Sequence, residues 1–502
     1  MEDQFVPISP SIVTNLEKLK LRFSDNELLV IRYLGNNEEI PIAAFVYINV
    51  LIDEKRLNQQ IIRKISEDLD KNTGPLDVTV IDSIYSMGAV HVIPLMEPAI
   101  NLISDAGILI FVEGHSKAYG IPLPGFVTRP VDEPMLELNV RGPREGFTED
   151  LQKNLGMVYR RMKSANLKAK SYVIGRQSQT KVILLYLDNK VNPDVLTEVK
   201  ERIEKIDLDV LVDSAQVEEW IQDNTFSPFP QILNTERPDR IITALNRGKI
   251  TILIDGTPIA LVAPSTFFEM MHPSEDLYER FYFANFLRVM RLITMFVSLF
   301  GPSLYIALTT FHLEMIPTPL MLAFLSTKAG IPFPTFVEAL LMEVSFEVLR
   351  EASLRLPRTV GQSVSIVGAL IIGEAAVQSG IVSRPMVIVV AMTGIASFSI
   401  PSFSTGIAFR ILRFPLMFLA ASTGVFGISL GFILILLHLS SLQFCGVPFF
   451  EPINSTSFRN TVKKFILLPV QLRSMSNHKK TIKSLNQGNY HLDIDVEEYD
   501  KH

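Results

Sequence analysis

The chain has 502 residues, of which 48% are hydrophobic, and its 47 Lys and Arg against 53 Asp and Glu give a net charge of −6. This length and apolar content exceed what one ordinary soluble domain needs, and the acidic balance excludes a basic nucleic-acid-binding protein. The single cysteine, Cys445, excludes an internal disulfide framework and a multi-cysteine zinc site.

No known catalytic motif stands out. The chain has no GxxxxGK[ST], GxGxxG, GxSxG or HExxH pattern, and its eight histidines are scattered without metal-ligand spacing. We therefore expect no enzyme activity, no catalytic residues, no cofactor and no metal.

The first half is expected to form an α/β domain of two subdomains of similar plan, residues 1–140 and 141–282. The start of the chain carries Glu2 and Asp3 with no apolar stretch behind them, so we expect no secretory signal and a cytoplasmic domain. Alternating apolar runs and amphipathic stretches favour mixed sheets with helices packed on them. The predicted strands are Leu28–Tyr33, Ala43–Ile48, Gly107–Val112, Lys181–Leu187 and the hairpin Lys249–Leu253 with Ile259–Val262; the predicted helices are Glu54–Leu69, Thr148–Ser164 and Pro193–Ile206.

The segment VRGPREG, residues 140–146, separates the two subdomains. Arg141 and Arg144 lie in this turn-forming stretch, just before Thr148, which is a plausible helix N-cap. The segment is either a linker between subdomains held by its arginines or a loop that docks an anion or a partner. The sequence favours the linker.

From about residue 283 to 450 charges become sparse, and we expect an α-helical polytopic membrane domain, followed by a basic polar tail at 451–502. About 20 apolar residues cross a bilayer. The candidate spans are Val289–Phe311, with a break at Gly301-Pro302, then Thr359–Ile381, Pro385–Pro401 and Phe414–Phe444. The last is either one long helix or two helices hinged near Gly424–Gly427.

Met315–Pro334 is bracketed by prolines and too short to span, so it is predicted to be re-entrant or interfacial. The helix predicted at Thr335–Arg355 places Glu343, Glu347 and Glu351 on one face. That face is either an ordinary solvated surface or the acidic vestibule of a pore.

Basic residues are expected on the cytoplasmic side of a membrane. Four clusters follow one another through the apolar region, and we place all of them, with the tail, on the inside. The clusters are Arg280, Arg288 and Arg291; Arg350, Arg355 and Arg358; Arg410 and Arg413; and Arg459, Lys463, Lys464 and Arg473.

Glu374 is an acid within an apolar, small-residue helix. An ionised carboxylate at that depth costs roughly 2.5–3.5 kcal/mol on insertion scales unless water or a partner reaches it. The helix is therefore expected to pack on other helices or to line a wet path, and Glu374 either faces that path or pairs with a neighbouring hydroxyl or arginine.

Long blocks of the chain resemble the A-subunit family of bacterial spore germinant receptors, in the family's order and over nearly the whole length. The blocks are VRGPREGFTEDLQKNLGMVYRRMK (140–163), PFPQILNTERPDR (228–240), GKITILIDGTPIALVAPSTFF (248–268), EDLYERF (275–281) and the stretch from GIPFPTF to SFSIP (330–401). One departure is Arg384, where the family more often has an uncharged residue.

The resemblance implies a multi-pass protein of the spore inner membrane with its N-terminal domain facing the spore core. It also implies a homo-oligomeric, pentameric channel that releases monovalent cations, surrounded by membrane lipid. Its partners would be a transporter-like B subunit, which binds the nutrient, and a lipoprotein C subunit. On this reading Glu374 attracts cations, and Val364, Val367 and Leu370 form a constriction that closes by dewetting.

Two other functions compete with the channel. A secondary transporter would bind the substrate itself, and would show inverted repeats with paired broken helices, which are not evident in the sequence. A membrane-anchored scaffold or enzyme would carry its function in the α/β half.

Overall fold

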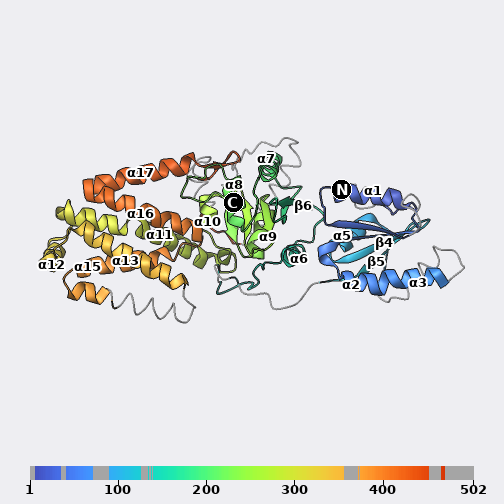
Figure 1. Ribbon diagram of the computed structural model, residues 1–502, viewed down its shortest axis with the longest axis horizontal. Coiled ribbons are helices and arrows are strands. Elements are labelled where there is room, and N and C mark those ends of the chain that lie inside the picture. The colour runs from blue at the N-terminus through green and yellow to red at the C-terminus, as the bar shows by residue number, and fades with distance from the viewer. Residues whose placement is uncertain are drawn as a thin grey trace, which may run out of the picture.

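The computed structural model describes residues 6–34, 41–71, 90–125, 134, 137, 139–355, 371, 373–451 and 465–469. Three parts follow one another along the long axis of the molecule (Figure 1). An α/β unit that carries the N-terminus lies at one end, a second α/β unit lies in the middle, and a bundle of helices forms the other end.

The first α/β unit is an antiparallel sheet with helices on both faces. Its strands are ordered β1-β2-β4-β5-β3, and the central strands β2 and β4 are buried along their whole length, as their unbroken apolar sequences predict. Helices α1 and α5 cover one face, and α2 to α3 cover the other. The elements are α1 (Ile12–Arg22), β1 (Leu29–Leu34), β2 (Ala43–Ile48), α2 (Glu54–Arg56), η3 (Leu57–Ile62), α3 (Arg63–Lys71), β3 (His91–Ile93), α5 (Met96–Ser104), β4 (Gly107–Val112) and β5 (Ala118–Pro122).

The second α/β unit repeats the plan of the first. Its strand order β6-β7-β9-β10-β8 is the same order when the strands are numbered within each unit, and again all neighbours are antiparallel. The elements are α6 (Leu151–Arg161), β6 (Leu167–Ile174), β7 (Thr180–Leu187), α7 (Pro193–Glu204), α8 (Ser214–Ile221), β8 (Leu233–Thr235), α9 (Pro238–Asn246), β9 (Ile250–Ile254) and β10 (Ala260–Ala263). The similar plan predicted for the two units is confirmed.

The strands and helices predicted in the α/β half are present, and one helix start is corrected. The hairpin through Asp255-Gly256 is confirmed, with Gly256 at φ +84°. Thr148 is not the N-cap of α6. Asp150 holds that position, because its carboxylate accepts hydrogen bonds from the backbone N–H groups of Gln152 (2.9 Å) and Lys153 (3.3 Å).

The helical end of the molecule is built on α11. In the part of the chain that the structure describes, α11 and α16 are both long and apolar enough to cross a bilayer. Residues 373–378 are also helical, and a small hairpin follows α17. The elements are α10 (Phe267–Met270), η4 (Ser274–Leu277), α11 (Phe281–Thr310), η5 (Leu313–Met315), α12 (Thr318–Lys328), α13 (Thr335–Arg355), α15 (Arg384–Ser397), α16 (Phe403–Thr423), α17 (Val425–Ser441), β11 (Gln443–Phe444) and β12 (Val447–Pro448).

Contacts at the helix ends fix the direction of each helix. Helices α11 and α16 begin beside the second α/β unit, where Asn234 donates to the Ser404 hydroxyl (3.0 Å). They run to the far end of the bundle, where His312 accepts from the Val425 backbone N–H (3.3 Å). Helix α17 then returns, and His438 near its end lies 2.9 Å from the Ser227 hydroxyl.

Two expectations for the helical region change, and the segment predicted to be re-entrant or interfacial contains a short helix. Pro302 does not break α11, which continues through it to Thr310. The region after Arg384 is one helix to Ser397 and a second from Phe403, so Arg410 and Arg413 lie inside α16 and not in a loop between spans. The proline-bracketed segment forms the short helix α12, none of whose residues is buried.

The hinge expected near Gly424–Gly427 is confirmed at Gly424. Its φ of +67° and ψ of −139° suit glycine, and an added Cβ would meet the His312 ring at 2.8 Å. Helices α16 and α17 therefore form an antiparallel pair that turns at this residue. The carbonyl of Leu419 lies 2.2 Å from where a Cβ on Gly427 would stand, so the two helices approach very closely.

Buried charges join the second α/β unit to the start of α11. The Asp276 carboxylate is 1% exposed and accepts from Arg288 (2.8 Å) and Arg291 (3.1 Å). Arg288 also donates to the carbonyl of Phe465 at 2.6 Å, and Asn285 exchanges two hydrogen bonds with Leu467. Residues 465–469 thus lie on the same side of the bundle as the α/β units, which is the side expected for the tail.

A second ion pair at this junction predicts how stability depends on pH. Burial by itself raises the pKa of Glu269, but Lys249 and Arg247 outweigh burial and lower the pKa to about 2. Because the pKa of Glu269 is lower in the folded protein, its ionised carboxylate stabilises the fold at pH values above the ordinary carboxyl pKa of 4.5. That stability is lost as the pH falls toward 2. The effect is modest because the side chain is 25% exposed and water screens it.

We expect Glu269→Gln to flatten the loss of thermal stability between pH 4.5 and 2, relative to the unchanged chain. The exposed acid Glu149 supplies the control, since Glu149→Gln should leave the slope as it is. Thermal unfolding across this pH range measures it, and equal slopes for both variants would contradict the assignment.

Candidate functional site in the helical bundle

A glutamate–arginine pair lies in the middle of the bundle. Glu343 of α13 and Arg413 of α16 are 0% and 1% exposed, and the Arg413 guanidinium donates to the Glu343 carboxylate at 2.5 Å. Arg413 also donates to the backbone carbonyl of Ser298 on α11 at 2.9 Å and to its hydroxyl at 3.3 Å. One side chain therefore ties three helices together through charge-assisted hydrogen bonds.

The pair lies deep within the bundle, measured along the helix axis. Arg413 is ten residues past the start of α16, which corresponds to about 15 Å at the rise of an α-helix. The whole helix is roughly 31 Å long by the same measure, close to the thickness of a bilayer core. Arg410 and Arg413, expected on the cytoplasmic side between two spans, therefore lie within a helix instead.

A second group of charges extends this network toward the surface. Glu347, one turn after Glu343, accepts from Arg410 at 3.1 Å and from Arg350 at 3.4 Å. Arg350 donates to the Ser397 hydroxyl at the end of α15 (2.7 Å), and its guanidinium lies over the Phe398 ring. The network of Glu343, Glu347, Arg350, Arg410 and Arg413, with Ser298 and Ser397, thus connects α11, α13, α15 and α16.

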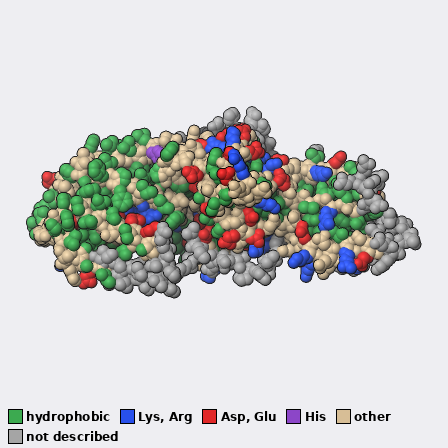
Figure 2. Space-filling model, viewed as in Figure 1, with side chains coloured by type: hydrophobic (Ala, Val, Ile, Leu, Met, Phe, Trp, Pro, Cys, Tyr) green, Lys and Arg blue, Asp and Glu red, His purple; other side chains and the backbone are tan. Residues whose placement is uncertain are grey.

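This second group is partly open to the outside of the chain. The side chains of Glu347, Arg410 and Arg350 are 26%, 18% and 11% exposed. Their neighbours along the helices include the exposed apolar side chains of Val348, Phe398 and Ile411. The surface of the bundle as a whole is mainly apolar, whereas the middle of the molecule carries many charged side chains (Figure 2). Glu347, Arg350 and Arg410 are thus charged side chains within an apolar surface. Contacts within a single chain do not explain why they are partly exposed there.

The residues predicted for a vestibule divide between these environments. Glu343 is enclosed in the bundle, Glu347 is at the partly open edge, and Glu351 is exposed one turn further along α13. Two of the three acids are therefore paired with arginines that the sequence analysis had placed elsewhere.

The predicted pore residues are only partly described. Glu374 is exposed, and its carboxylate accepts a hydrogen bond from Gln378 at 2.9 Å, one turn away on the same helix. Val364, Val367 and Leu370 lie outside the described residues.

The predicted linker loop packs against the segment that leads into α11. Gly142, at φ +120°, lies against the Tyr278 ring, and the Val140 backbone N–H donates to Glu275 (3.0 Å). Arg141 and Arg144 are exposed on this loop. Neighbouring Glu145 holds Arg160 and Arg161 of α6, and although burial opposes it, the two arginines lower the pKa of Glu145.

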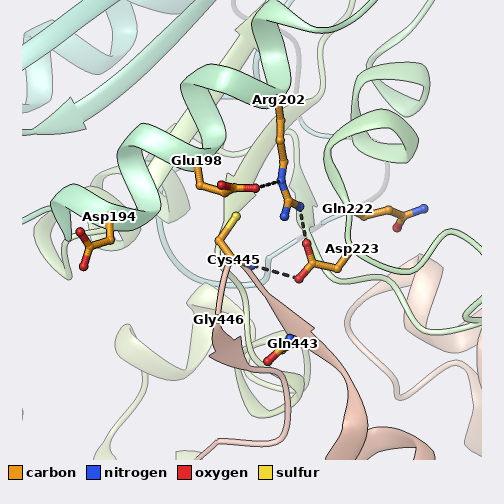
Figure 3. A pocket seen from close by; sticks show the side chains of 8 residues that line it. All are labelled: Asp194, Glu198, Arg202, Gln222, Asp223, Gln443, Cys445 and Gly446. Atoms are coloured by element: carbon orange, nitrogen blue, oxygen red, sulfur yellow. Dashed lines mark hydrogen bonds and ion pairs between the residues drawn. The ribbon is translucent and has the colours of Figure 1, made fainter.

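A hollow of about 670 Å³ lies where the hairpin after α17 meets the second α/β unit (Figure 3). Three of its charged side chains form a network: Arg202 pairs with Glu198 (2.8 Å) and Asp223, and Asp223 accepts from the Cys445 backbone N–H (3.1 Å). Burial raises the pKa of the Cys445 thiol to about 12, so the thiol stays protonated. The arrangement clamps the hairpin to α7 and α8 and offers no reactive group.

Comparison with known proteins identifies the family. Residues 17–480 match the family described as "Bacillus/Clostridium GerA spore germination protein". The chain belongs to the GerA family. This family comprises A subunits of germinant receptors, which are involved in spore germination, and the sequence blocks had indicated the same family.

Individual relatives extend over most of the chain. The chain is 42% identical over 457 residues to the "Uncharacterized membrane protein YfkQ" of Bacillus subtilis, which covers 90% of this chain and 88% of that protein. It is 40% identical to "Spore germination protein KA" and 36% identical to "Spore germination protein A1" of the same organism, over 89% of this chain and 82% and 94% of those proteins. A crystal structure of the N-terminal domain of the A subunit of the Bacillus megaterium spore germinant receptor GerK3 is 29% identical, with a TM-score of 0.41, over 52% of this chain and 98% of that chain.

The sequence contains a signal for the buried network in the spacing of its charges. Glu343, Glu347 and Arg350 follow one another at helical spacing, and Arg410 and Arg413 do so in a second apolar stretch. Opposite charges at matching spacings on two apolar helices are consistent with two faces that meet. The rule that basic residues mark the cytoplasmic side placed Arg410 and Arg413 on that side, between two predicted spans.

Proposed function

We propose that this member of the GerA family is the membrane-embedded A subunit of a germinant receptor and forms an oligomeric, cation-conducting channel. In this proposal the helical bundle crosses the spore inner membrane several times and the α/β units face the spore core. The chain associates with copies of itself, as a pentamer, and with a B subunit and a lipoprotein C subunit. Nutrient binding by a partner subunit opens the cation-conducting path of the channel.

The observation that carries the proposal is the partly exposed group Glu347, Arg350 and Arg410. Charged side chains at membrane depth face the bundle interior, a partner protein or water, because contact with lipid is costly. Helix geometry places these side chains well inside the apolar part, not at its edge. The face that bears them is thus better suited to another copy of the chain or to a wet path than to lipid.

The directions of the helices are consistent with a multi-pass arrangement. Helices α11 and α16 lead away from the α/β units, and α13, α15 and α17 lead back toward them. Residues 373–378 precede the far-end turn before α15. We count residues 373–378 as part of an outward crossing. Together with α11, α13, α15, α16 and α17 this gives six crossings, so the α/β units and the tail lie on the same side of the membrane.

Glu374 is our candidate for the acid that attracts cations to the path. It is exposed on the chain, on a helix whose neighbouring small residues include the buried Gly373 and the exposed Ala375. Val364, Val367 and Leu370, which precede Glu374 in the sequence, remain the proposed hydrophobic constriction.

We expect Glu374→Gln to lower the preference of the conductance for cations over anions roughly several-fold, since it removes the charge near the path. The measurement is the reversal potential of currents in bilayers under a salt gradient. Glu314→Gln, at another exposed acid of the helical part, serves as the control. Unchanged selectivity in a normally assembled Glu374→Gln protein would remove Glu374 from the pore while leaving the channel itself in place.

A further inference from the structure

A third buried carboxylate lies at the end of the bundle farthest from the α/β units. Glu338 of α13 is 1% exposed, and among the described residues it accepts one hydrogen bond, from the backbone N–H of Ser383 at 2.9 Å. In the part of the chain that the structure describes, no arginine, lysine or histidine lies within ion-pair distance of it. Glu338 thus differs from Glu343 and Asp276, which are both paired with arginines.

Two hydroxyl groups next to Glu338 also lack partners. The Tyr305 hydroxyl of α11 lies beside the Ser383 side chain, and Tyr305 packs in the same buried cluster as Val382 and Ala339, which precede Ser383 and follow Glu338 in the chain. The Tyr305 and Ser383 residues are 7% and 1% exposed, and neither hydroxyl oxygen has a hydrogen-bond partner among the described residues. Buried hydroxyls without partners cost free energy, and in native proteins such groups usually bind water or an ion.

The nearest positive charge is bound elsewhere. The Lys328 ammonium, at the end of α12, donates to the Thr335 hydroxyl and lies 5.8 Å from the centre of the Tyr305 ring. It is close enough to influence the cluster without neutralising Glu338 by contact. Helix α12 has no buried residue, so little packing holds Lys328 in its place.

From this geometry we infer that Glu338, Tyr305 and Ser383 form a binding site for a monovalent cation. A carboxylate and two hydroxyls are hard oxygen ligands, which suit an alkali-metal ion. One carboxylate balances one positive charge, whereas calcium sites in proteins gather six to eight oxygen ligands, including several carboxylates. Tyr305, Glu338 and Ser383 come from α11, α13 and the turn before α15, so a bound cation would bring these three elements together.

The inference rests on the proposed function only in treating the bundle as membrane-embedded, and it is tested by binding and not by conductance. The full chain in lipid nanodiscs is titrated with NaCl or KCl in choline chloride at constant ionic strength, and its Tm is followed. We expect Na⁺ or K⁺ to raise the Tm saturably, by about 2 °C or more. A Tm that is the same in choline and in both alkali salts would overturn the site.

Variants locate the effect. Glu338→Gln should abolish the ion-specific rise, and Tyr305→Phe should weaken the apparent Kd by roughly tenfold, since it deletes one ligand and keeps the carboxylate. Glu314→Gln, at an exposed acid near the same end, should keep the full rise. If Glu338→Gln does not fold, Tyr305→Phe and Ser383→Ala decide, and an unchanged Kd in both would overturn the site.

A variant of Lys328 tests the direction in which a neighbouring positive charge changes the affinity for the cation. Because its charge competes with the cation, Lys328→Gln should tighten the apparent Kd. If Lys328 itself neutralises Glu338, Lys328→Gln lowers the Tm in every salt without changing the ion dependence, and that result contradicts a cation site. A channel that conducts without this ion effect would refute the site alone, and an ion effect without conductance would leave the site intact and refute the channel.

Discussion

Arg413→Met is expected to destabilise the helical bundle by about 3–5 kcal/mol, because it leaves the Glu343 carboxylate buried without its counter-charge. The same change removes the hydrogen bonds that Arg413 donates to Ser298, so α11 and α16 lose a shared polar contact. Thermal unfolding in detergent or nanodiscs, with the yield of folded protein, measures the loss.

A double variant separates the charge from the packing. Arg413→Met with Glu343→Met removes both charges, and we expect it to recover most of the stability, since replacing a buried pair by apolar groups is often neutral. Arg384→Met, at an exposed position on α15, is the matched control and should change little. If the double variant is as unstable as the single one, the buried pair is not the cause.

Asp276→Asn is expected to release the start of α11 from the second α/β unit. It leaves the guanidinium groups of Arg288 and Arg291, 7% and 12% exposed, without an anion, at a cost of about 3–5 kcal/mol. Because Arg288 also donates to the Phe465 carbonyl, residues 465–469 should loosen at the same time.

Limited proteolysis and thermal unfolding test this prediction together. We expect faster cleavage near residues 271–281 and a lower Tm in Asp276→Asn, while Glu279→Gln, a nearby acid without an ion pair among the described residues, stays close to the unchanged chain. Wild-type cleavage and Tm in Asp276→Asn would mean that apolar packing alone holds the junction.

Local elements of the fold follow from the sequence where burial is uniform. Strands β2 and β4 have unbroken apolar sequences, β9 has four aliphatic residues around one threonine, and Pro193 marks the start of α7, so these elements were predictable. The strands β3 and β8 have three residues each, which is too short to show an alternation of apolar and polar residues. Their pairing with β5 and β10 depends on long-range contacts, which is why the strand order of both sheets came only from the structure.

The candidate site was predicted only in part: its acids were identified from the sequence, but their pairing with arginines on α16 was not. The acids on α13 were recognised, but their partners lie 63 and 70 residues away on α16, and no periodicity joins positions so far apart. Arg410 and Arg413 lie between two apolar runs, which is the pattern of a loop on the cytoplasmic side. Only the continuous helix from Phe403 to Thr423 shows that they are inside the bundle.

The measurement that tests the account most directly is the electrical conductance of the purified chain in planar bilayers, alone and with its B and C subunits. We predict cation-selective currents that require the assembled chain and respond to the germinant when the partners are present. An oligomer that assembles normally, binds its partners and passes no current under any of these conditions would contradict the channel and favour a scaffold.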